Sequence, residues 1–184
     1  MIITFFGHSN YESTLEDEER LIKLMETVIK GNQVDFYLGG YGAFNTFALH
    51  CARKYKKIHP NAKLIFITPY LGSWLDTRKD IINNVFDMII YPEIEHTPKR
   101  FAILKRNEWM VKQSDYVFGY VKTHYGGAYK ALLYAHKHKK PYTNLYQGKY
   151  ELFWKCNTKD LAKILQGLFV LINFIFVFVC KFYR

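Results

Sequence analysis

Short apolar runs alternate with amphipathic stretches along the first 146 residues. The runs are short and rich in β-branched and aromatic residues, which is typical of buried strands. They cover residues 2–6, 34–38, 64–68, 88–91, 116–121 and 142–145. The stretches between them repeat apolar residues at the helical period and predict helices over residues 14–30, 43–55, 98–113 and 128–138. Alternating strands and helices predict an α/β fold, a Rossmann-like three-layer sandwich with a mostly parallel sheet.

Local signals mark several helix ends. Ser13-Thr14-Leu15-Glu16 has the spacing of a capping box, and Gly31 is placed to end the helix that follows it. Thr97-Pro98 predicts an N-cap followed by proline in the first helical position. These signals agree with the hydrophobic pattern on where the first and third long helices begin.

Two glycine turns lie between a predicted strand and a predicted helix. The first is Gly39-Gly40-Tyr41-Gly42, and the second is Gly126-Gly127. Such a turn directs bare backbone N–H groups and the positive end of the helix dipole at one point, where phosphate binds. Two turns of this kind predict a nucleotide-type ligand that spans both. The alternative is that these glycines only allow a left-handed backbone.

The carboxyl ends of the strands bring further residues to the same edge. In open α/β sheets ligands bind beyond these ends, where the strand order reverses. This rule predicts that one rim gathers the following segments: His8, Gly39 to Gly42, Pro69-Tyr70, Tyr91 to Glu93 and Thr123 to Gly127.

Composition narrows the class of protein. A hydrophobic fraction of 49% and an aromatic fraction of 18% exclude a disordered chain. The net charge of +10 favours an anionic partner, such as a nucleotide, nucleic acid or an anionic membrane surface, although solvated lysine-rich helix faces would explain it as well. The three cysteines have no metal-ligand spacing, and no secretory signal begins the chain. We therefore predict a cytoplasmic protein, and neither a metal site nor a cofactor.

The end of the chain departs from the alternating pattern. Residues 164–180 carry no charge and are almost wholly apolar, with Lys163 before them and Lys181 after them. Seventeen uncharged residues are just enough for a membrane-helix candidate. The alternatives are a terminal helix or strand packed in the core, or a surface for self-association. We therefore expect a ligand-binding domain over residues 1–146 and a C-terminal extension over residues 147–184.

The motifs as a set resemble those of the SLOG superfamily, which unites the Smf/DprA proteins with the LOG phosphoribohydrolases. The similarity covers residues 1–146 and is greatest to small, stand-alone bacterial members. It implies a Rossmann-like fold, a nucleotide or nucleotide-derived ligand, and self-association as a homodimer. The segments that carry it are Phe5-Phe6-Gly7-His8, Gly39 to Phe44, Pro98 to Ile103, Lys105 to Val117 and Gly126-Gly127-Ala128.

A comparison with the LOG signature separates binding from catalysis. Arg106, Met110 and Asp115 match its arginine, methionine and aspartate at the same spacing, while Asn107 replaces its lysine. The catalytic glutamate is replaced by Lys130 or Ala131, depending on the alignment. Cleavage of an N-glycosidic bond needs a carboxylate, so the resemblance implies phosphate binding without the LOG reaction. Glu93 and Glu108 are the carboxylates that could act as a relocated catalytic group.

The residues themselves suggest individual roles. Arg106 suits a bidentate phosphate clamp, with a surface arginine as the alternative. His8 would hydrogen-bond a ribose or phosphate, act as a base, or serve only as a cap. The rings of Tyr41, His124 and Tyr125 would stack on a base or pack. The predicted ligand-binding residues are His8, Gly39, Gly40, Tyr41, Gly42, Arg106, Thr123, Gly126 and Gly127.

Three functional hypotheses follow. The first is a protein that senses or sequesters a nucleotide-type small molecule without turning it over. The second is a nucleoside-phosphate N-glycosidase or related phosphoribohydrolase that uses a displaced carboxylate. The third is an interaction protein that binds DNA or attaches to a membrane through residues 164–180.

Overall fold

The structure is a computed structural model and describes residues 1–72, 75, 77 and 79–146. The predicted extension over residues 147–184, with the apolar segment 164–180, lies outside this range, so its role stays a prediction. Across the described residues, no helix has the length and the apolar character that crossing a membrane requires.

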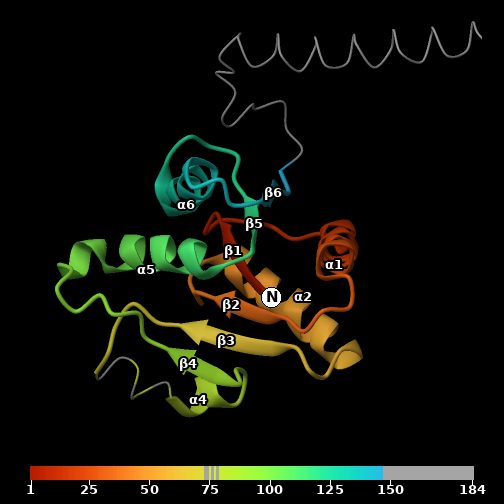
Figure 1. The fold of residues 1–184 in the computed structure, drawn as a ribbon, viewed down its shortest axis with the longest axis horizontal. Coiled ribbons are helices and arrows are strands. Elements are labelled where there is room, and N and C mark those ends of the chain that lie inside the picture. The colour runs from red at the N-terminus through yellow and green to blue at the C-terminus, as the bar shows by residue number, and fades with distance from the viewer. Residues whose placement is uncertain (73–74, 76, 78, 147–184) are drawn as a thin grey trace, which may run out of the picture. The chain divides into compact units, whose positions relative to one another are not determined.

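Six strands form one sheet, and every neighbouring pair of strands is parallel (Figure 1). The spatial order is β4-β3-β2-β1-β5-β6. This arrangement confirms the predicted parallel α/β sheet. The strands are β1 (Ile2–Gly7), β2 (Asp35–Leu38), β3 (Lys63–Ile67), β4 (Met88–Ile90), β5 (Tyr116–Tyr120) and β6 (Tyr142–Asn144).

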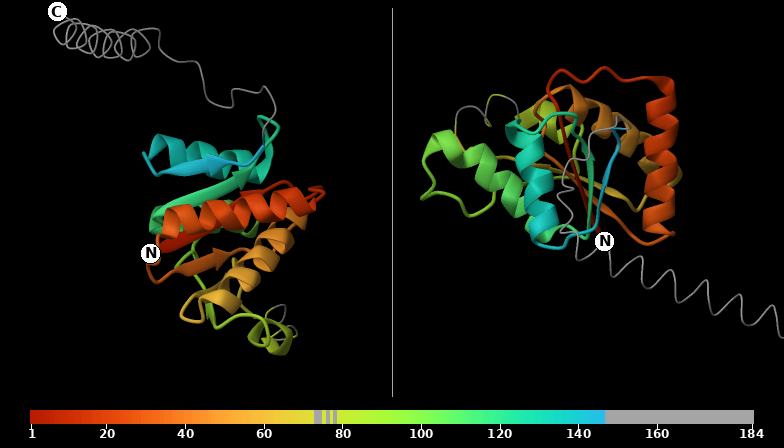
Figure 2. Two further views of the ribbon diagram at one scale, coloured as in Figure 1. Left: turned by 90° about the vertical axis from the view of Figure 1, so that its right-hand side faces the viewer. Right: turned by 90° about the horizontal axis from the view of Figure 1, so that it is seen from above.

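Helices cover both faces of the sheet, which makes the three layers of a Rossmann-like sandwich. Figure 2 shows α1 and α2 on one side of the strands and α5 and α6 on the other. The short helix α4 precedes β4 and was not predicted from the sequence. The helices are α1 (Leu15–Ile29), α2 (Ala43–Ile58), α4 (Lys79–Asn83), α5 (Lys99–Gln113) and α6 (Gly126–Lys137).

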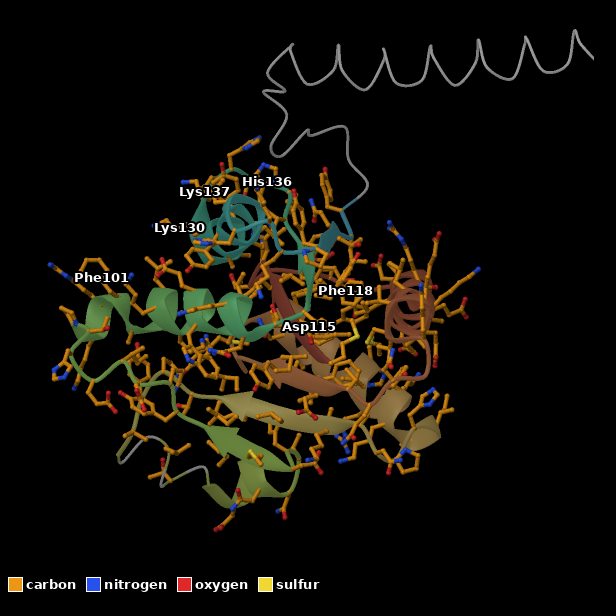
Figure 3. All side chains as sticks on the ribbon, viewed as in Figure 1. Phe101, Asp115, Phe118, Lys130, His136 and Lys137 are labelled. Carbon is orange, nitrogen blue, oxygen red and sulfur yellow. The ribbon has the colours of Figure 1, made fainter. Side chains whose placement is uncertain are left out.

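Aromatic side chains of the three central strands pack against one another in the core. Phe5 of β1 lies with its ring centroid 5.9 Å from those of Phe36 on β2 and Phe118 on β5. All three are fully buried, and Phe118 lies inside the molecule in Figure 3. Burying such rings supplies much of the hydrophobic stabilisation of a domain this size. The core therefore fixes β1 between β2 and β5, at the centre of the sheet.

Two predicted helix starts need correction. The N-cap of α1 is Thr14, whose hydroxyl accepts from the N–H of Asp17 while the Asp17 carboxylate accepts in return, so the capping box lies one residue later than predicted. The N-cap of α5 is Pro98 and not Thr97. At the other end of α1, Lys30 and Gly31 both have positive φ, as the predicted glycine stop requires.

The strand order reverses beside β1. The chain runs outward from β1 through β2 and β3 to β4, then crosses to the other side of β1 to form β5 and β6. The carboxyl ends of β1, β2 and β5 therefore meet at a topological switch point, where doubly wound sheets bind ligands. Asp115 lies at the opposite edge, where its carboxylate accepts from the N–H of Ile2 at 2.7 Å (Figure 3). This aspartate orients strands and is remote from the switch point.

Candidate functional site

A cavity of about 570 Å³ opens at the switch point. Its walls come from the carboxyl ends of β1, β2 and β5, the first turn of α6 and one side of α5. Most of the residues predicted to bind a ligand meet here: His8, Gly39, Tyr41, Arg106, Thr123, Gly126 and Gly127. Gly40 and Gly42 do not line it.

The helix start that follows the first glycine turn is already occupied by the protein itself. The N–H of Ala43 donates to the carbonyl of Ser9 at 3.1 Å, and that of Phe44 donates to the carbonyl of His8 at 3.4 Å. The next two N–H groups, of Asn45 and Thr46, both donate to the carbonyl of Gly42. The first turn of α2 therefore has no N–H group left for a phosphate, although its glycine pattern is the more complete of the two.

The glycines of the first turn are required by close packing. A Cβ on Gly39 would lie 2.4 Å from Nη1 of Arg106, and a Cβ on Gly40 would lie 2.4 Å from the ring of Phe66. Gly42 has a φ of +83°, and a Cβ there would lie 2.9 Å from the Cα of Ser9. Each glycine thus leaves space for a neighbouring group that a Cβ would overlap. Close packing alone explains the Gly-Gly-x-Gly sequence, without a ligand.

The second glycine turn leaves its backbone open. In the described part of the chain, the N–H groups of Gly126, Gly127 and Ala128 have no acceptor. The N-cap residue Tyr125 makes no side-chain capping bond, and the first turn of α6 contains no acidic residue. A Cβ on Gly127 would have only the amide nitrogen of Asn107 within 4 Å, at 3.9 Å. The start of α6 therefore lines the cavity with backbone N–H groups that the described residues do not use, which is the type of helix end that can bind an anion.

Arg106 is buried beneath the cavity, so the alternative of a surface arginine is wrong. Arg106 is 2% exposed, and its Nη1 donates to the carbonyls of Gly39 and Ile67, both at 2.9 Å. Its guanidinium lies 5.3 Å from the centroid of the Tyr41 ring, a cation–π distance. Its Nε is buried and has no hydrogen-bond partner among the residues that the structure describes. Burial lowers the pKa of Arg106 to about 10, so the side chain stays charged at neutral pH.

No carboxylate lines the cavity among the residues that the structure describes. Arg106 is absent from the ion pairs of this part of the chain, and Lys122 adds a second positive charge to the cavity wall. A buried cation normally has a counter-charge, because its transfer from water is costly. The electrostatics of the cavity therefore favour an anionic ligand.

His8 holds the loop that precedes α6. Its Nε2 accepts from the backbone N–H of Lys122 at 2.9 Å and lies 3.4 Å from the hydroxyl of Thr123. Because Nε2 accepts, the ring proton of the neutral form is on Nδ1. Burial and the nearby charge of Lys122 lower the pKa of His8 below its ordinary value of 6.5. Of the roles predicted for His8, the geometry favours the structural one.

Two buried asparagines line the cavity and were not among the predicted ligand-binding residues. Asn45 donates from Nδ2 to the carbonyl of Tyr41 at 2.8 Å, while its Oδ1 is buried without a partner. Asn107 also has an unpartnered Oδ1. The helical period could have found Asn45, which follows Gly42 by three residues on the first turn of α2. Asn107 could have been found from its position beside Arg106, where it replaces a family lysine.

The weak catalytic candidates lie elsewhere. Glu108 forms an ion pair with Lys105 at 2.8 Å, and neither Glu93 nor Glu108 lines the cavity. The segments predicted to share one rim do follow the carboxyl ends of parallel strands, but they divide between two cavities. Pro69, Tyr70 and Tyr91 line a second cavity of about 320 Å³ that borders β3, β4 and the start of α5. Glu93 lines neither of these two cavities.

Charged residues are distributed unevenly along the first 146 residues. Residues 1–98 contain ten Lys and Arg side chains and twelve carboxylates, whereas residues 99–146 contain ten Lys and Arg side chains and two carboxylates. Residues 99–146 include α5 and α6, which cover one face of the sheet. Figure 3 shows Lys130, His136 and Lys137 on the outer side of α6. The α5–α6 face is therefore the basic face of the described structure.

Comparisons with known proteins identify the fold. No protein-family model and no curated protein sequence matches the chain. DNA processing protein A (DprA) from Helicobacter pylori, which binds single-stranded DNA, superposes with a TM-score of 0.56 at 19% identity over 82% of this chain and 67% of its own. DprA from Streptococcus pneumoniae superposes with a TM-score of 0.54 at 11% identity over 83% of this chain and 53% of its own. The chain shares its fold with part of these DprA proteins.

This result confirms, at the level of fold, the resemblance on the Smf/DprA side of the superfamily. The chain spans about two thirds of the Helicobacter pylori DprA and about half of the Streptococcus pneumoniae DprA. No group of three or more His, Cys, Asp or Glu side chains is placed to hold a metal ion within the described ranges. The cavity at the switch point of this DprA fold is the candidate functional site.

Proposed function

We propose that this protein binds a nucleotide through its phosphate in the cavity at the switch point, and that it holds the nucleotide without cleaving it. The observation that carries this proposal is the open start of α6, where three backbone N–H groups have no acceptor among the described residues and belong to residues that line a cavity together with Arg106 and Lys122. A helix end of this kind is a general phosphate site.

Lys122 and Arg106 would act on the phosphate in different ways. Lys122 is exposed at the cavity wall and would act as a mobile point charge on the phosphate. Arg106 is held by two carbonyls, so it would contribute a fixed positive charge beneath the ligand and little movement. The N–H groups of α6 would provide the directional hydrogen bonds. Charge-assisted bonds of this type are about twice as strong as neutral ones.

Binding without hydrolysis follows from the residue types in the cavity. An N-glycosidase needs a carboxylate to activate water or to stabilise an oxocarbenium-like transition state. The described residues place no carboxylate in this cavity. The glycosidase hypothesis would therefore need a group from outside the cavity, and simple binding needs none.

We also propose that residues 1–146 are the binding domain, that residues 147–184 are an extension to it, and that the protein acts in the cytoplasm as a homodimer. These proposals rest on the sequence pattern and the superfamily resemblance. The sequence pattern is also the basis for the apolar segment 164–180, which would cross a membrane, pack in the core or form an interface for self-association.

A second candidate function is the binding of single-stranded nucleic acid. It is favoured by the basic α5–α6 face, and the Helicobacter pylori protein with the same fold binds single-stranded DNA. Phosphate contacts along such a face would give an affinity that falls steeply with salt. A mononucleotide in the cavity would depend on few charges and would show a shallow salt dependence.

The test is a titration of the four ribonucleoside monophosphates into the wild-type protein, Lys122→Gln and Lys130→Gln by calorimetry. Both variants remove one exposed positive charge, but only Lys122 lines the cavity. We expect Lys122→Gln to weaken binding by up to about 5-fold, since an exposed ion pair contributes at most about 1 kcal/mol, and Lys130→Gln to leave it unchanged.

Three outcomes would contradict the proposal. The absence of heat with any of the four monophosphates would remove the nucleotide function. Equal weakening by both variants, with a steep salt dependence and a preference for an oligonucleotide, would favour the nucleic-acid function instead. Release of free base during incubation, followed by chromatography, would show that the ligand is cleaved.

A further inference from the structure

Two large apolar side chains are left exposed in the wall of the cavity. Tyr125 is 74% exposed and Ile103 is 38% exposed, and both line the cavity at the switch point. A protein normally buries such groups or places them singly on an outer surface. Apolar side chains beside charged groups in a concave site are typical of a pocket that binds a ring system and an anion together.

The other aromatic side chains around the two turns have neighbours inside the protein. The Tyr41 ring lies under the guanidinium of Arg106. The His124 ring contacts that of Tyr129, edge to face, with the centroids 5.7 Å apart. Tyr125 makes no ring contact within the described structure, although it is 74% exposed, which is more than any other large aromatic side chain among the exposed ones there. Its ring is therefore available to a ligand in a way that the other two are not.

Tyr125 also has a fixed place relative to the open helix end. It is the N-cap residue of α6, with an extended backbone (φ −144°), and it directly precedes Gly126, Gly127 and Ala128, whose N–H groups have no acceptor in the described ranges. A ring on this residue and a phosphate on those N–H groups would lie within the span of one nucleotide. Ile103, from α5, adds apolar surface to the same cavity.

We propose that Tyr125 is the stacking platform for the base of the bound nucleotide, with Ile103 as additional apolar wall. This inference rests on the proposed function and makes it more specific. The ligand class is a nucleoside phosphate with its base attached, and a sugar phosphate or inorganic phosphate that occupies only the start of α6 binds much more weakly. Base–aromatic stacking tolerates every base, because every base has a π-face.

The experiment compares AMP, ribose 5-phosphate and inorganic phosphate as probes on the wild-type protein, Tyr125→Ala and Tyr125→Phe. We expect the wild-type protein to bind AMP more tightly than ribose 5-phosphate. Tyr125→Ala should lower the affinity for AMP by about 5- to 100-fold, the range for loss of one stacked base, and leave that for ribose 5-phosphate unchanged. Tyr125→Phe keeps the ring and should bind AMP as the wild-type protein does.

The outcomes separate this inference from the proposed function. Equal affinity of Tyr125→Ala and wild-type protein for AMP would overturn the stacking role and leave phosphate binding intact. An equal loss for AMP and ribose 5-phosphate would also overturn it, because the tyrosine would then act on the phosphate site. Failure of the wild-type protein to bind either organic phosphate would remove the proposed function itself. A short oligothymidylate as a fourth probe distinguishes a free nucleotide from one within a single strand: tighter binding of AMP supports the free nucleotide, and tighter binding of the oligonucleotide overturns it.

Discussion

The two glycine turns of this protein have similar sequences, but the backbone N–H groups at the helix starts beside them differ in whether the protein supplies their acceptors. The turn at Gly39–Gly42 has the fuller glycine pattern, yet the N–H groups that follow it donate to carbonyls of the β1–α1 loop and of Gly42. The turn at Gly126–Gly127 has a shorter pattern, and its N–H groups have no acceptor within the described residues. Glycine spacing therefore reports where the backbone comes close to something. Only the hydrogen-bond pattern shows whether that neighbour is the protein itself or remains to be supplied.

The difference predicts that equivalent substitutions act on different properties in the two turns. Alanine in the first turn should damage the fold, because its methyl group would overlap a side chain or backbone of the core. In the second turn, alanine at Gly127 should be accepted by the fold and should obstruct the ligand, whereas Gly126 has a φ of +91° that alanine disfavours.

Gly40→Ala is expected to have the largest effect. Its Cβ would lie 2.4 Å from the ring of the buried Phe66, and its φ of +68° is unfavourable for alanine. Overpacking and the left-handed backbone together should lower the free energy of unfolding by about 4 kcal/mol, measured by urea denaturation. The matched control, Gly127→Ala, should change it by less than about 1 kcal/mol, because alanine favours the helix and the site is open. The same control should weaken nucleotide binding.

A Gly127→Ala variant as unstable as Gly40→Ala would contradict the comparison, because it would place a hidden packing requirement at the second turn. A Gly40→Ala variant with wild-type stability would also contradict the comparison, because the first turn would then have no packing requirement for glycine at this position.

Arg106→Ala should have the next largest effect, and on stability before binding. The substitution leaves the carbonyls of Gly39 and Ile67 without their shared donor and opens a space under the cavity. We expect the free energy of unfolding to fall by about 3 kcal/mol, measured by denaturation in the absence of ligand. An unchanged stability, with only the affinity for nucleotides reduced, would mean that Arg106 is a clamp for the ligand and not a support for the first turn.

The smallest expected effect is a pH dependence of the loop before α6. The lowered pKa of His8 means that folding favours its neutral form, which accepts from the N–H of Lys122. This stabilisation is fully present above the ordinary pKa of 6.5 and is lost as the pH falls through 6.5 toward the lowered value. The melting temperature of the wild-type protein should therefore fall relative to that of His8→Gln between pH 7.5 and 5.5, because glutamine keeps an acceptor that does not titrate in this range.

Parallel pH profiles of the two proteins would show that His8 does not hold the loop through its neutral ring. Hydrogen exchange at the amide of Lys122 gives a second measure, and its protection should decrease over the same pH range in the wild-type protein only.

The fold could be predicted from the sequence because its signals are local and agree. Apolar runs gave the six strands, and the helical period between them gave the long helices. The cavity was located by a general rule on strand ends, and seven of the nine predicted binding residues line it. The limits of the helices were less certain: α6 begins two residues earlier than expected, so that both glycines belong to its first turn.

The details of the site depended on contacts between residues far apart in the chain. The pairing of Arg106 with Gly39 and Ile67 joins three elements, and nothing in the sequence near Arg106 signals it. The same is true of the carbonyl of Ser9, which occupies the start of α2. For this reason the sequence predicted a ligand at both turns, whereas the hydrogen bonds leave N–H groups open at the start of α6 and fill those at the start of α2.

Phosphate binding at the start of α6 is tested most directly by a nitrogen–proton correlation spectrum of the labelled protein during titration with AMP. We predict that the amide signals of Gly126, Gly127 and Ala128 shift together in a saturable manner, while those of Ala43 and Phe44 stay in place. Saturable shifts at Ala43 and Phe44, with Gly126 to Ala128 unchanged, would contradict it, because the phosphate would then occupy the turn that the protein already fills.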